Sequence, residues 1–543
     1  QGGIDAAVNG DTVLVAPGTY YENLNFKGKG VHLKSEDGPN STCLRKLNQG
    51  SILVFVSNES NNSVVEGFEF YNGNALTGGA IYCFESSPMI INNIFYENNS
   101  TYRGGAIYCW YYSSPVIRGN KIIENTADEN GGGIYCGYSS SPIIEDSLFR
   151  FNSTVGEGGA IYVHNSSPKI INNIIEENRA TNPGGTGIGS GIQCIDCPHV
   201  EISYNVISNN ESNKVGSAIY CKESSVNMHG NVIQNHNNNY GPIWFGNSEA
   251  ILLCNRIKNN VTPASGAGIS LSGSNLKMYN NIITENYSDN NGGAISAGSS
   301  ALLIVNNTIC NNYSILKGGA INCGNSTLEI VNSILWGNNS SAGGEEIWIG
   351  VSSEVTISYS DISNCPMSIF VEHGGVLNWG PGNLSEYPEI VSYYEEDYHI
   401  SNSSPCRDTG NNSVVSESYD FEGDPRISVG LVDMGADEFH PHLYYTGIPE
   451  PNGDIKLKFV GIPDDTVRLW VGSGVLDPPL NFPYYGDWYL EAPILLGMIL
   501  GNIPVDGVYV LPVNIPPDYT PWDIPLQAGI GTVLSNLCVV GVE

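Results

Sequence analysis

Short apolar runs separated by glycine, serine–proline and asparagine repeat along most of this chain. The clearest copy is the hexapeptide Gly-Gly-Ala-Ile-Tyr-Cys at Gly78–Cys83, which returns at Gly104–Cys109 and, as Gly-Gly-Gly-Ile-Tyr-Cys, at Gly131–Cys136. Weaker copies continue as far as Gly344–Ile349. The copies lie about 26 residues apart, and a fixed period of this size is typical of solenoid proteins.

Each repeat holds three apolar runs, and these runs are too short and too rich in β-branched residues to form helices. The pattern instead predicts three strands joined by turns at the Gly, Ser-Pro and Asn positions. One repeat then forms one coil, and coils stacked about 4.8 Å apart pair strand on strand along the molecule. We therefore predict an all-β chain whose main part is a right-handed parallel β-helix with three-strand coils.

Two columns of asparagine recur at fixed places in the repeat. One column includes Asn93 and Asn120, and the other follows five residues later at Asn98 and Asn125. We expect the stacked amides to satisfy one another and the backbone of the turns, where the chain leaves strand geometry.

A cysteine column and a tyrosine column occupy adjacent positions of the hexapeptide strand. Because cysteine alternates with apolar residues such as Val163 and Leu271, its column is predicted to point inward. Alternation along a strand then places the tyrosine column outward. Stacking of like side chains explains that column, and a face that binds a ligand or partner is the alternative. The cysteine column is Cys83, Cys109, Cys136, Cys194, Cys221 and Cys323, and the other is Tyr82, Tyr108, Tyr135, Tyr162, Tyr220, Trp244 and Trp348.

Loss of the period divides the chain into four predicted parts. Residues 1–76 form an N-terminal cap and irregular first coils, and residues 77–365 form the regular coils. Residues 366–440 form the last coils and a C-terminal cap. From about residue 441 to 543, proline and aromatic residues increase and short apolar runs alternate with Pro/Gly turns, which predicts a small β-sandwich.

The charge of the chain excludes several partners. Asp and Glu number 55 against 22 Lys and Arg, which gives a net charge of -33. Such a surface repels nucleic acid and anionic membranes. No apolar run is long enough to span a bilayer, and no secretory signal is present, so the sequence is expected to be a mature or truncated form.

The stretch from Gly10 to Tyr20 (Gly-Asp-Thr-Val-Leu-Val-Ala-Pro-Gly-Thr-Tyr) resembles the first coil of secreted bacterial right-handed β-helix proteins of the pectate-lyase-like superfamily. The Gly-Gly-x-Ile-Tyr-Cys and Ser-Ser-Pro-x-Ile units resemble repeats of large predicted extracellular proteins of planctomycetes. The stretch Asp408–Phe439 resembles the closing motif of the same proteins, and the last hundred residues resemble their terminal domain. The resemblance implies an extracellular or cell-surface location, a helix that caps the first coil, and a start part-way through that cap. It does not imply one activity, because this fold hosts lyases, hydrolases, adhesins and structural proteins.

Candidate binding residues lie directly after two of the hexapeptides. Trp110, Tyr111 and Tyr112 follow one copy and Tyr138 follows the next, so the four aromatic side chains are expected to form one exposed patch. Such a patch binds sugars, or it packs against loops or a neighbouring subunit. No catalytic residue is identified, because Arg256-Ile-Lys258 alone matches the motifs of galacturonan hydrolases on this fold and is expected to be a chance match. Whether the chain is an enzyme stays open, with the non-enzymatic interpretation favoured.

The C-terminal cap holds the densest group of acidic residues, and it is the best candidate for binding calcium, the one cofactor considered. The group comprises Asp408, Asp420, Asp424, Asp433 and Asp437. Asn-x-Ser/Thr sequons are abundant, and those in turns are candidates for glycosylation. They include Asn40, Asn58, Asn61, Asn99, Asn165, Asn325, Asn383, Asn402 and Asn411.

Three functions fit this pattern. The favoured one is an extracellular structural or adhesive protein that assembles end to end with itself into a glycosylated filament. The alternatives are a lyase-like enzyme acting on polysaccharide and a carbohydrate-binding protein without catalysis. The expected partners are therefore other copies of the chain or an extracellular polysaccharide.

Overall fold

The computed structural model describes residues 1–181, 187–393, 396–427 and 430–439 with their side chains, and further on the backbone of nine strands between residues 442 and 542. The chain divides into two compact units. The first comprises residues 1–358 and 362–383, and the second comprises residues 359–361 and 384–543.

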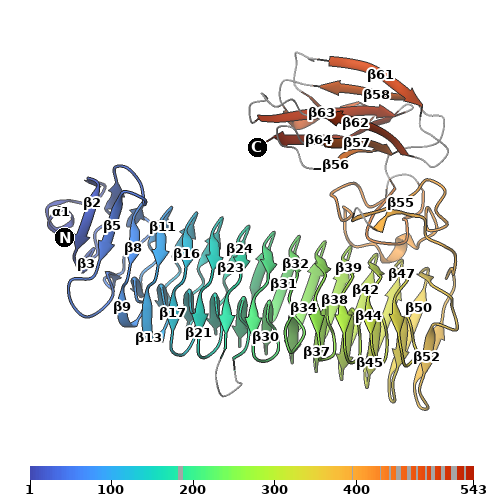
Figure 1. The fold of residues 1–543 in the computed structure, drawn as a ribbon, viewed down its shortest axis with the longest axis horizontal. Coiled ribbons are helices and arrows are strands. Elements are labelled where there is room, and N and C mark those ends of the chain that lie inside the picture. Colours follow the sequence, from blue (N-terminus) through green and yellow to red (C-terminus); the bar gives the residue numbers. More distant parts are fainter. Residues whose placement is uncertain are drawn as a thin grey trace. The chain divides into compact units, whose positions relative to one another are not determined.

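Three long parallel sheets run along the first unit (Figure 1). Sheet I has 15 strands, from β1 (Thr12–Val15) to β53 (Val376–Trp379). Sheet II has 14 strands, from β3 (Leu24–Asn25) to β52 (Ile369–Val371), and it contains the hexapeptides. Sheet III also has 14 strands, from β2 (Gly18–Tyr21) to β51 (Asp361–Ile362). The predicted parallel β-helix is confirmed.

One coil shows how the repeat folds. It passes through β10 (Ile81–Phe84), β11 (Met89–Ile91) and β12 (Ile94–Tyr96) and then forms a fourth strand, β13 (Asn99–Arg103). Ile81 pairs in parallel with Ile107 of the next coil, so the hexapeptides stack in register. The fourth strand was not predicted, because most of its equivalents are only two residues long and carry polar or small residues.

The interior of the coils is filled from every strand by alternate side chains. Ile81, Cys83, Ile90 and Phe95 of one coil are all 0% exposed. The six members of the cysteine column are likewise buried, as predicted, and the described cysteines are free thiols. At the N-terminal end, α1 (Gly2–Ala6) buries Ile4 against this core, which matches the cap helix implied by the resemblance.

The asparagine columns form two ladders of hydrogen bonds, as predicted. The backbone N–H of Asn125 donates to Oδ1 of Asn152 in the next coil at 3.1 Å. Its Nδ2 donates to the same Oδ1 at 2.9 Å and to the backbone oxygen of Phe95 in the preceding coil at 3.0 Å. Each amide therefore satisfies a turn that would otherwise leave buried polar groups without partners.

A third ladder is made of serine hydroxyls at the turn between sheets II and I. The backbone N–H of Ser86 donates to Oγ of Ser113 at 3.2 Å, and Ser113 repeats this contact to Ser140 at 3.1 Å. A buried carboxylate meets the first of these serines, since Ser86 Oγ donates to Glu59 at 2.9 Å. Similarly, Nδ2 of Asn338 at the end of the second asparagine ladder donates to buried Glu346 at 2.7 Å.

The second unit contains antiparallel strands. β54 (Ile390–Ser392) pairs with β55 (Asp397–Ile400), and the strands after residue 441 form sheets in the orders β56-β57-β62, β61-β58-β63-β64 and β59-β60. That two of these sheets face each other as a sandwich stays a prediction, as do the predicted domain boundaries. The nine strands are β56 (His442–Gly447), β57 (Asp454–Val460), β58 (Thr466–Val471), β59 (Val475–Phe482), β60 (Gly486–Leu490), β61 (Leu496–Asn502), β62 (Val508–Asn514), β63 (Trp522–Ile530) and β64 (Val533–Val542).

Across the residues that the structure describes, we find no helix with the length and apolar character needed to cross a membrane.

Candidate functional site

Two adjacent coils carry one extra residue in the turn between sheets II and I. In the preceding coil two residues lie between Cys83 and the ladder serine Ser86, whereas three lie between Cys109 and Ser113. The coil after that repeats the longer spacing, from Cys136 to its serine at position 140. The ladder serines stay in register, so the extra residue must bulge outward.

Each enlarged turn contains two consecutive residues in the left-handed region. The φ angles are 55° for Tyr111 and 59° for Tyr112, and 55° for Tyr138 and 59° for Ser139. The left-handed conformation costs about 1–2 kcal/mol for a residue with a side chain. Aromatic residues held there are an unusual choice for a turn, and such strain is often found at functional sites.

The enlarged turns bring the four predicted aromatic side chains together with two neighbours. The Trp110 ring lies 4.3 Å from that of Tyr138, and the Tyr111 ring lies 5.0 Å from that of Tyr112. Tyr112 is 63% exposed, Tyr111 42% and Tyr138 41%. We call this group the aromatic surface; it comprises Phe84, Trp110, Tyr111, Tyr112, Tyr138 and His164.

Gly137 allows Trp110 to fold across the neighbouring strand. Gly137 pairs with Trp110 between β14 (Ile107–Trp110) and β18 (Ile134–Gly137). A Cβ atom on Gly137 would lie 3.0 Å from the Trp110 ring and 2.9 Å from the ring of Tyr135. The indole therefore occupies the space that a side chain at position 137 would fill, and it is half-buried.

Trp110 covers one part of the tyrosine column, in which Tyr108, Tyr135 and Tyr162 are buried and Tyr82 and Trp244 are half-buried. The rings of Tyr108 and Tyr135 stack at 5.1 Å, and Trp110 packs on Tyr108 at 5.6 Å. Tyr135 is only 2% exposed, and burial raises its pKa to about 12, so the phenol is neutral. The stacking interpretation is confirmed. The binding-face interpretation is wrong for Tyr108, Tyr135 and Tyr162, because neighbouring side chains cover them.

Acidic residues border the aromatic surface. His164 Nε2 lies 3.4 Å from Asp196 Oδ2, and exposed Glu85, which follows Phe84, donates its backbone N–H to the carbonyl oxygen of Tyr111 at 3.1 Å. In the described residues, the cluster of three metal-ligating side chains lies in the second unit, at His399, Glu422 and Asp437. The aromatic surface therefore has the chemistry of a platform for groups with an apolar face, such as the C–H faces of sugar rings.

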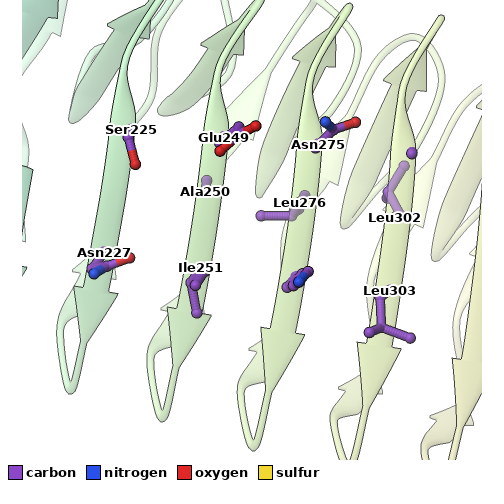
Figure 2. A pocket seen from close by; sticks show the side chains of 11 residues that line it. Ser225, Asn227, Glu249, Ala250, Ile251, Asn275, Leu276, Leu302 and Leu303 are labelled. Atoms are coloured by element: carbon purple, nitrogen blue, oxygen red, sulfur yellow. The ribbon is translucent and has the colours of Figure 1, made fainter. Parts of the chain in front are cut away.

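A groove lies on the outer face of sheet I (Figure 2). It has a volume of about 400 Å³ and crosses four adjacent strands. Its floor mixes apolar and polar side chains, for example Ile251 beside Lys277, with Glu249 at one edge. The strands are β31 (Ser225–His229), β34 (Glu249–Leu253), β38 (Asn275–Tyr279) and β42 (Ala301–Val305).

The strands under this groove are five residues long, whereas those of the Ser-Ser-Pro coils have three. Pro115 stands where the later coils have Leu276 and Leu302. Proline lacks the N–H that would extend the ladder, so the strand of a Ser-Ser-Pro coil starts two residues later than its equivalent under the groove. The groove's single Lys and single Glu give it no pair of carboxylates for acid–base cleavage of a glycan.

The acidic residues predicted to bind calcium are partly used by the backbone. Oδ1 of Asp420 accepts the N–H groups of residues 422, 423 and 424, and its Oδ2 accepts that of Glu438 at 3.0 Å. Oδ2 of Asp433 accepts the N–H of Phe439 at 2.6 Å. Asp424 is half-buried in the loop closed by Asp420, and Asp437 lies beside His399. The fifth carboxylate, Asp408, lies 3.4 Å from Arg407. A calcium site formed by these carboxylates stays a prediction.

The glycosylation candidates lie mainly in turns. Asn40, Asn58, Asn61, Asn165 and Asn325 are exposed. The other four, at positions 99, 383, 402 and 411, are half-buried.

The comparisons with known proteins concern the fold. The family profile described as right handed beta helix region matches residues 29–190. This match agrees with the parallel order of the strands and indicates that the β-helix is right-handed. A crystal structure of pectate lyase Pel9A is similar over 81% of this chain and 90% of its own, with 10% identity and a TM-score of 0.34. The enzymatically active domain of bacteriophage CBA120 tailspike protein 2 is similar over 90% of this chain and 68% of its own, with 11% identity and a TM-score of 0.25. No curated protein matched the chain.

The family profile and the order of the strands together identify the main part of the chain as a right-handed parallel β-helix. The likenesses to solved structures say nothing about what it binds or whether it catalyses a reaction, because the identities and TM-scores are low and one fold supports many activities.

Proposed function

We propose that this protein is an extracellular adhesive β-helix that binds a polysaccharide through the aromatic surface without cleaving it. The observation that carries the proposal is the pair of enlarged turns. Two adjacent coils place Tyr111, Tyr112 and Tyr138 outward in left-handed conformations, although a turn of ordinary length would keep the ladders intact.

The dimensions of the surface suit a chain of sugars. It spans four coils, from Phe84 to His164, and three coil spacings amount to about 14 Å. Exposed rings along this length offer several stacking positions. A polysaccharide that lies along the helix axis would therefore contact more than one ring at once.

The charge of the protein favours a neutral glycan over a polyanionic one. The net charge is -33, and the aromatic surface adds no cluster of basic residues to offset it. A polyuronate would be repelled by this field. We therefore expect binding to neutral glucans or galactans and weak or no binding to polygalacturonate.

Affinity electrophoresis of the full chain in gels that contain each of these polysaccharides tests the proposal. Retardation by a neutral polymer, lost in the double variant Tyr111→Ala/Tyr112→Ala, supports it. A suitable control is Tyr287→Ala, since Tyr287 is also an exposed tyrosine, stacked on Tyr313 at 5.2 Å in another part of the β-helix. Equal retardation of the double variant and the wild type would refute the proposal. Release of reducing or unsaturated ends from any polymer would show an enzyme instead.

The extracellular location and the glycans belong to the same proposal. Exposed turn sequons such as Asn58 and Asn165 fit a glycosylated surface, and modification there would leave the buried ladders intact. Intact-mass measurement of the protein from its source would show a mass above 58.4 kDa.

A second function, assembly of the β-helix end to end, is supported by the two ends of the first unit. The last coil exposes apolar side chains, with Met367 at 76%, Phe370 at 42% and Trp379 at 46%. At the other end, a pocket of about 410 Å³ is lined by α1 and by apolar residues that include Leu14. Contact between unlike ends does not close on itself and would produce filaments.

Sedimentation velocity of the wild type and of Met367→Asp tests this assembly. Concentration-dependent growth of the wild type, reduced in the variant, supports end-to-end contact. A monomer at all concentrations would refute it.

A further inference from the structure

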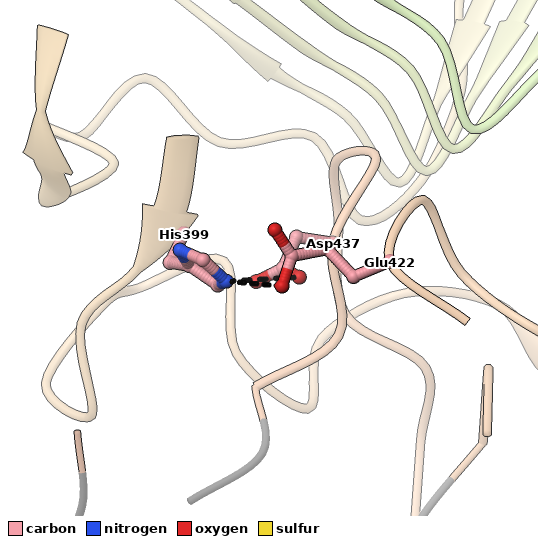
Figure 3. A group of neighbouring side chains, drawn as sticks. All are labelled: His399, Glu422 and Asp437. Carbon is pink, nitrogen blue, oxygen red and sulfur yellow. Dashed lines mark hydrogen bonds and ion pairs between the residues drawn. The ribbon is translucent and has the colours of Figure 1, made fainter. Parts of the chain in front are cut away.

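A buried histidine in the second unit is surrounded by carboxylates from three separate segments (Figure 3). His399 Nε2 lies 2.9 Å from Glu422 Oε2 and 4.0 Å from Asp437 Oδ1. The side chains of His399 and Asp437 are each 8% exposed, whereas that of Glu422 is 36% exposed and leaves the group open to solvent on one side.

Asp397 hydrogen-bonds the imidazole at Nδ1, the nitrogen that faces away from Glu422 and Asp437. Asp397 and His399 stand two residues apart on β55, so they share one face of the strand. His399 Nδ1 donates to Asp397 Oδ1 at 2.5 Å, which directs Nε2 toward Glu422 and Asp437. A carboxylate behind a histidine is the arrangement that orients and strengthens histidine ligands of metal ions.

Asp420 holds the two carboxylates in place. Its Oδ1 accepts the N–H of Glu422 at 3.0 Å, and its Oδ2 accepts the N–H of Glu438, next to Asp437, at 3.0 Å. The loop that carries Glu422 and the segment that carries Asp437 are therefore fixed to each other. Asp420 is a positioning residue in this arrangement and not a ligand.

Asp437 has an oxygen that the fold does not use. Within the described part of the chain, its Oδ2 is buried and has no hydrogen-bond partner. Burying a carboxylate without a partner is costly, and buried charges are normally paired or bound to metal. His399 is already shared between Asp397 and Glu422, so one imidazole does not satisfy three carboxylates.

We propose that His399 Nε2, Glu422 and Asp437 bind one divalent transition-metal ion. Their ligand atoms all lie within 4.8 Å of one another, and ligands at about 2.1 Å from a tetrahedral metal are about 3.4 Å apart. Small side-chain rotations therefore suffice to close the site. The imidazole favours a transition metal over calcium, which prefers oxygen ligands alone. The ion joins β55 to two irregular segments and so stabilises a part of the chain with little regular structure.

Mn²⁺ is the probe for the test, because the free cysteines of this chain would compete for Zn²⁺. The full chain is treated with chelator, and Mn²⁺ binding is followed by electron paramagnetic resonance. We expect one tightly bound Mn²⁺ with a nitrogen coupling from one imidazole. His399→Gln should abolish the coupling, and Glu422→Gln and Asp437→Asn should each weaken binding at least tenfold.

The matched control is Asp408→Asn, since the Asp408 side chain is 47% exposed in the same unit and lies outside the group. It should bind Mn²⁺ as the wild type does. Glu422 is partly exposed, so Glu422→Gln should fold normally, which its circular dichroism without metal verifies. Bound Mn²⁺ without nitrogen coupling, equal affinity of Glu422→Gln and wild type, or a site that takes Ca²⁺ and is not displaced by Mn²⁺ would each overturn the proposal.

Discussion

His236 replaces an asparagine in the second ladder, and this predicts a specific loss of stability in mild acid. Its side chain is 1% exposed and lies between Asn210 and Asn260. Nδ1 is 3.1 Å from Asn260 Oδ1, an acceptor, and Nε2 is 3.5 Å from Asn210 Nδ2, a donor. These partners assign the proton to Nδ1 and leave Nε2 as the acceptor.

A second proton on the ring would face the Asn210 amide donor in a buried site. Burial accordingly lowers the pKa of His236 from 6.5 to about 4. Above pH 6.5 the imidazole is neutral in both the folded and unfolded chains, so it contributes no pH dependence. Between pH 6.5 and about 4 the His236 imidazole is protonated in the unfolded chain and neutral in the folded chain. Stability therefore falls with falling pH between these two values, and at pH 4.5 the loss amounts to about 2–3 kcal/mol.

The substitution His236→Asn restores the amide in the ladder and removes this pH-dependent loss of stability. The free energies of unfolding of wild type and variant are measured in urea at pH 7 and pH 4.5. Hydrogen exchange then follows the stability of the coils that contain Asn210 and Asn260. We expect the variant to lose about 2–3 kcal/mol less than the wild type between the two pH values. His199→Asn, an exposed histidine in a neighbouring coil, is the control and should follow the wild type. Equal losses in His236→Asn and wild type would refute a neutral imidazole in the ladder.

Two further substitutions test the ladders and the support of the aromatic surface. Asn286→Ala leaves the buried N–H and Nδ2 donors of Asn260 without their acceptor. We therefore expect the free energy of unfolding, measured in urea, to fall by about 4 kcal/mol. A fall of under about 1 kcal/mol would show that water replaces the amide. Gly137→Val places a side chain where the Trp110 ring lies, and we expect red-shifted tryptophan emission and weaker polysaccharide binding. Gly324→Ala, whose Cβ would meet its nearest atom at 3.6 Å, is the matched control, and identical spectra for the two variants would contradict the proposed packing of Trp110.

The coil architecture was predictable because the period places the same residue type at the same corner of every coil. Asparagine at Asn98 and Asn125 has few physical roles at a buried turn, and cysteine exchanging with valine shows an inward position. The serine ladder was visible in the same way, in the recurring Ser-Ser-Pro, but its hydroxyls were not recognised as ladder members.

The burial of the tyrosine column was not predictable from alternation. Alternation says which side of the strand a residue occupies, and it correctly places Tyr135 away from the core. What covers Tyr135 depends on the Trp110 ring crossing Gly137, a contact between neighbouring coils that no period encodes.

The cluster at His399 was missed for a different reason. Its side chains come from a short strand and two irregular segments, so no spacing in the sequence brings positions 397, 422 and 437 together. The composition pointed to the same region, since Asp437 was among the calcium candidates. It could not show that Asp420 and Asp433 accept hydrogen bonds from backbone N–H groups.

The most direct test of the proposed function is isothermal titration calorimetry with an oligosaccharide of the neutral polymer that retards the protein most. The wild type, Tyr111→Ala/Tyr112→Ala and Tyr287→Ala are compared under the same conditions. Each lost aromatic contact is worth about 0.5–1.5 kcal/mol, so the double variant should bind about 5- to 150-fold more weakly, while Tyr287→Ala binds as the wild type does. Unchanged affinity in the double variant, or equal weakening in both, would contradict binding at the aromatic surface.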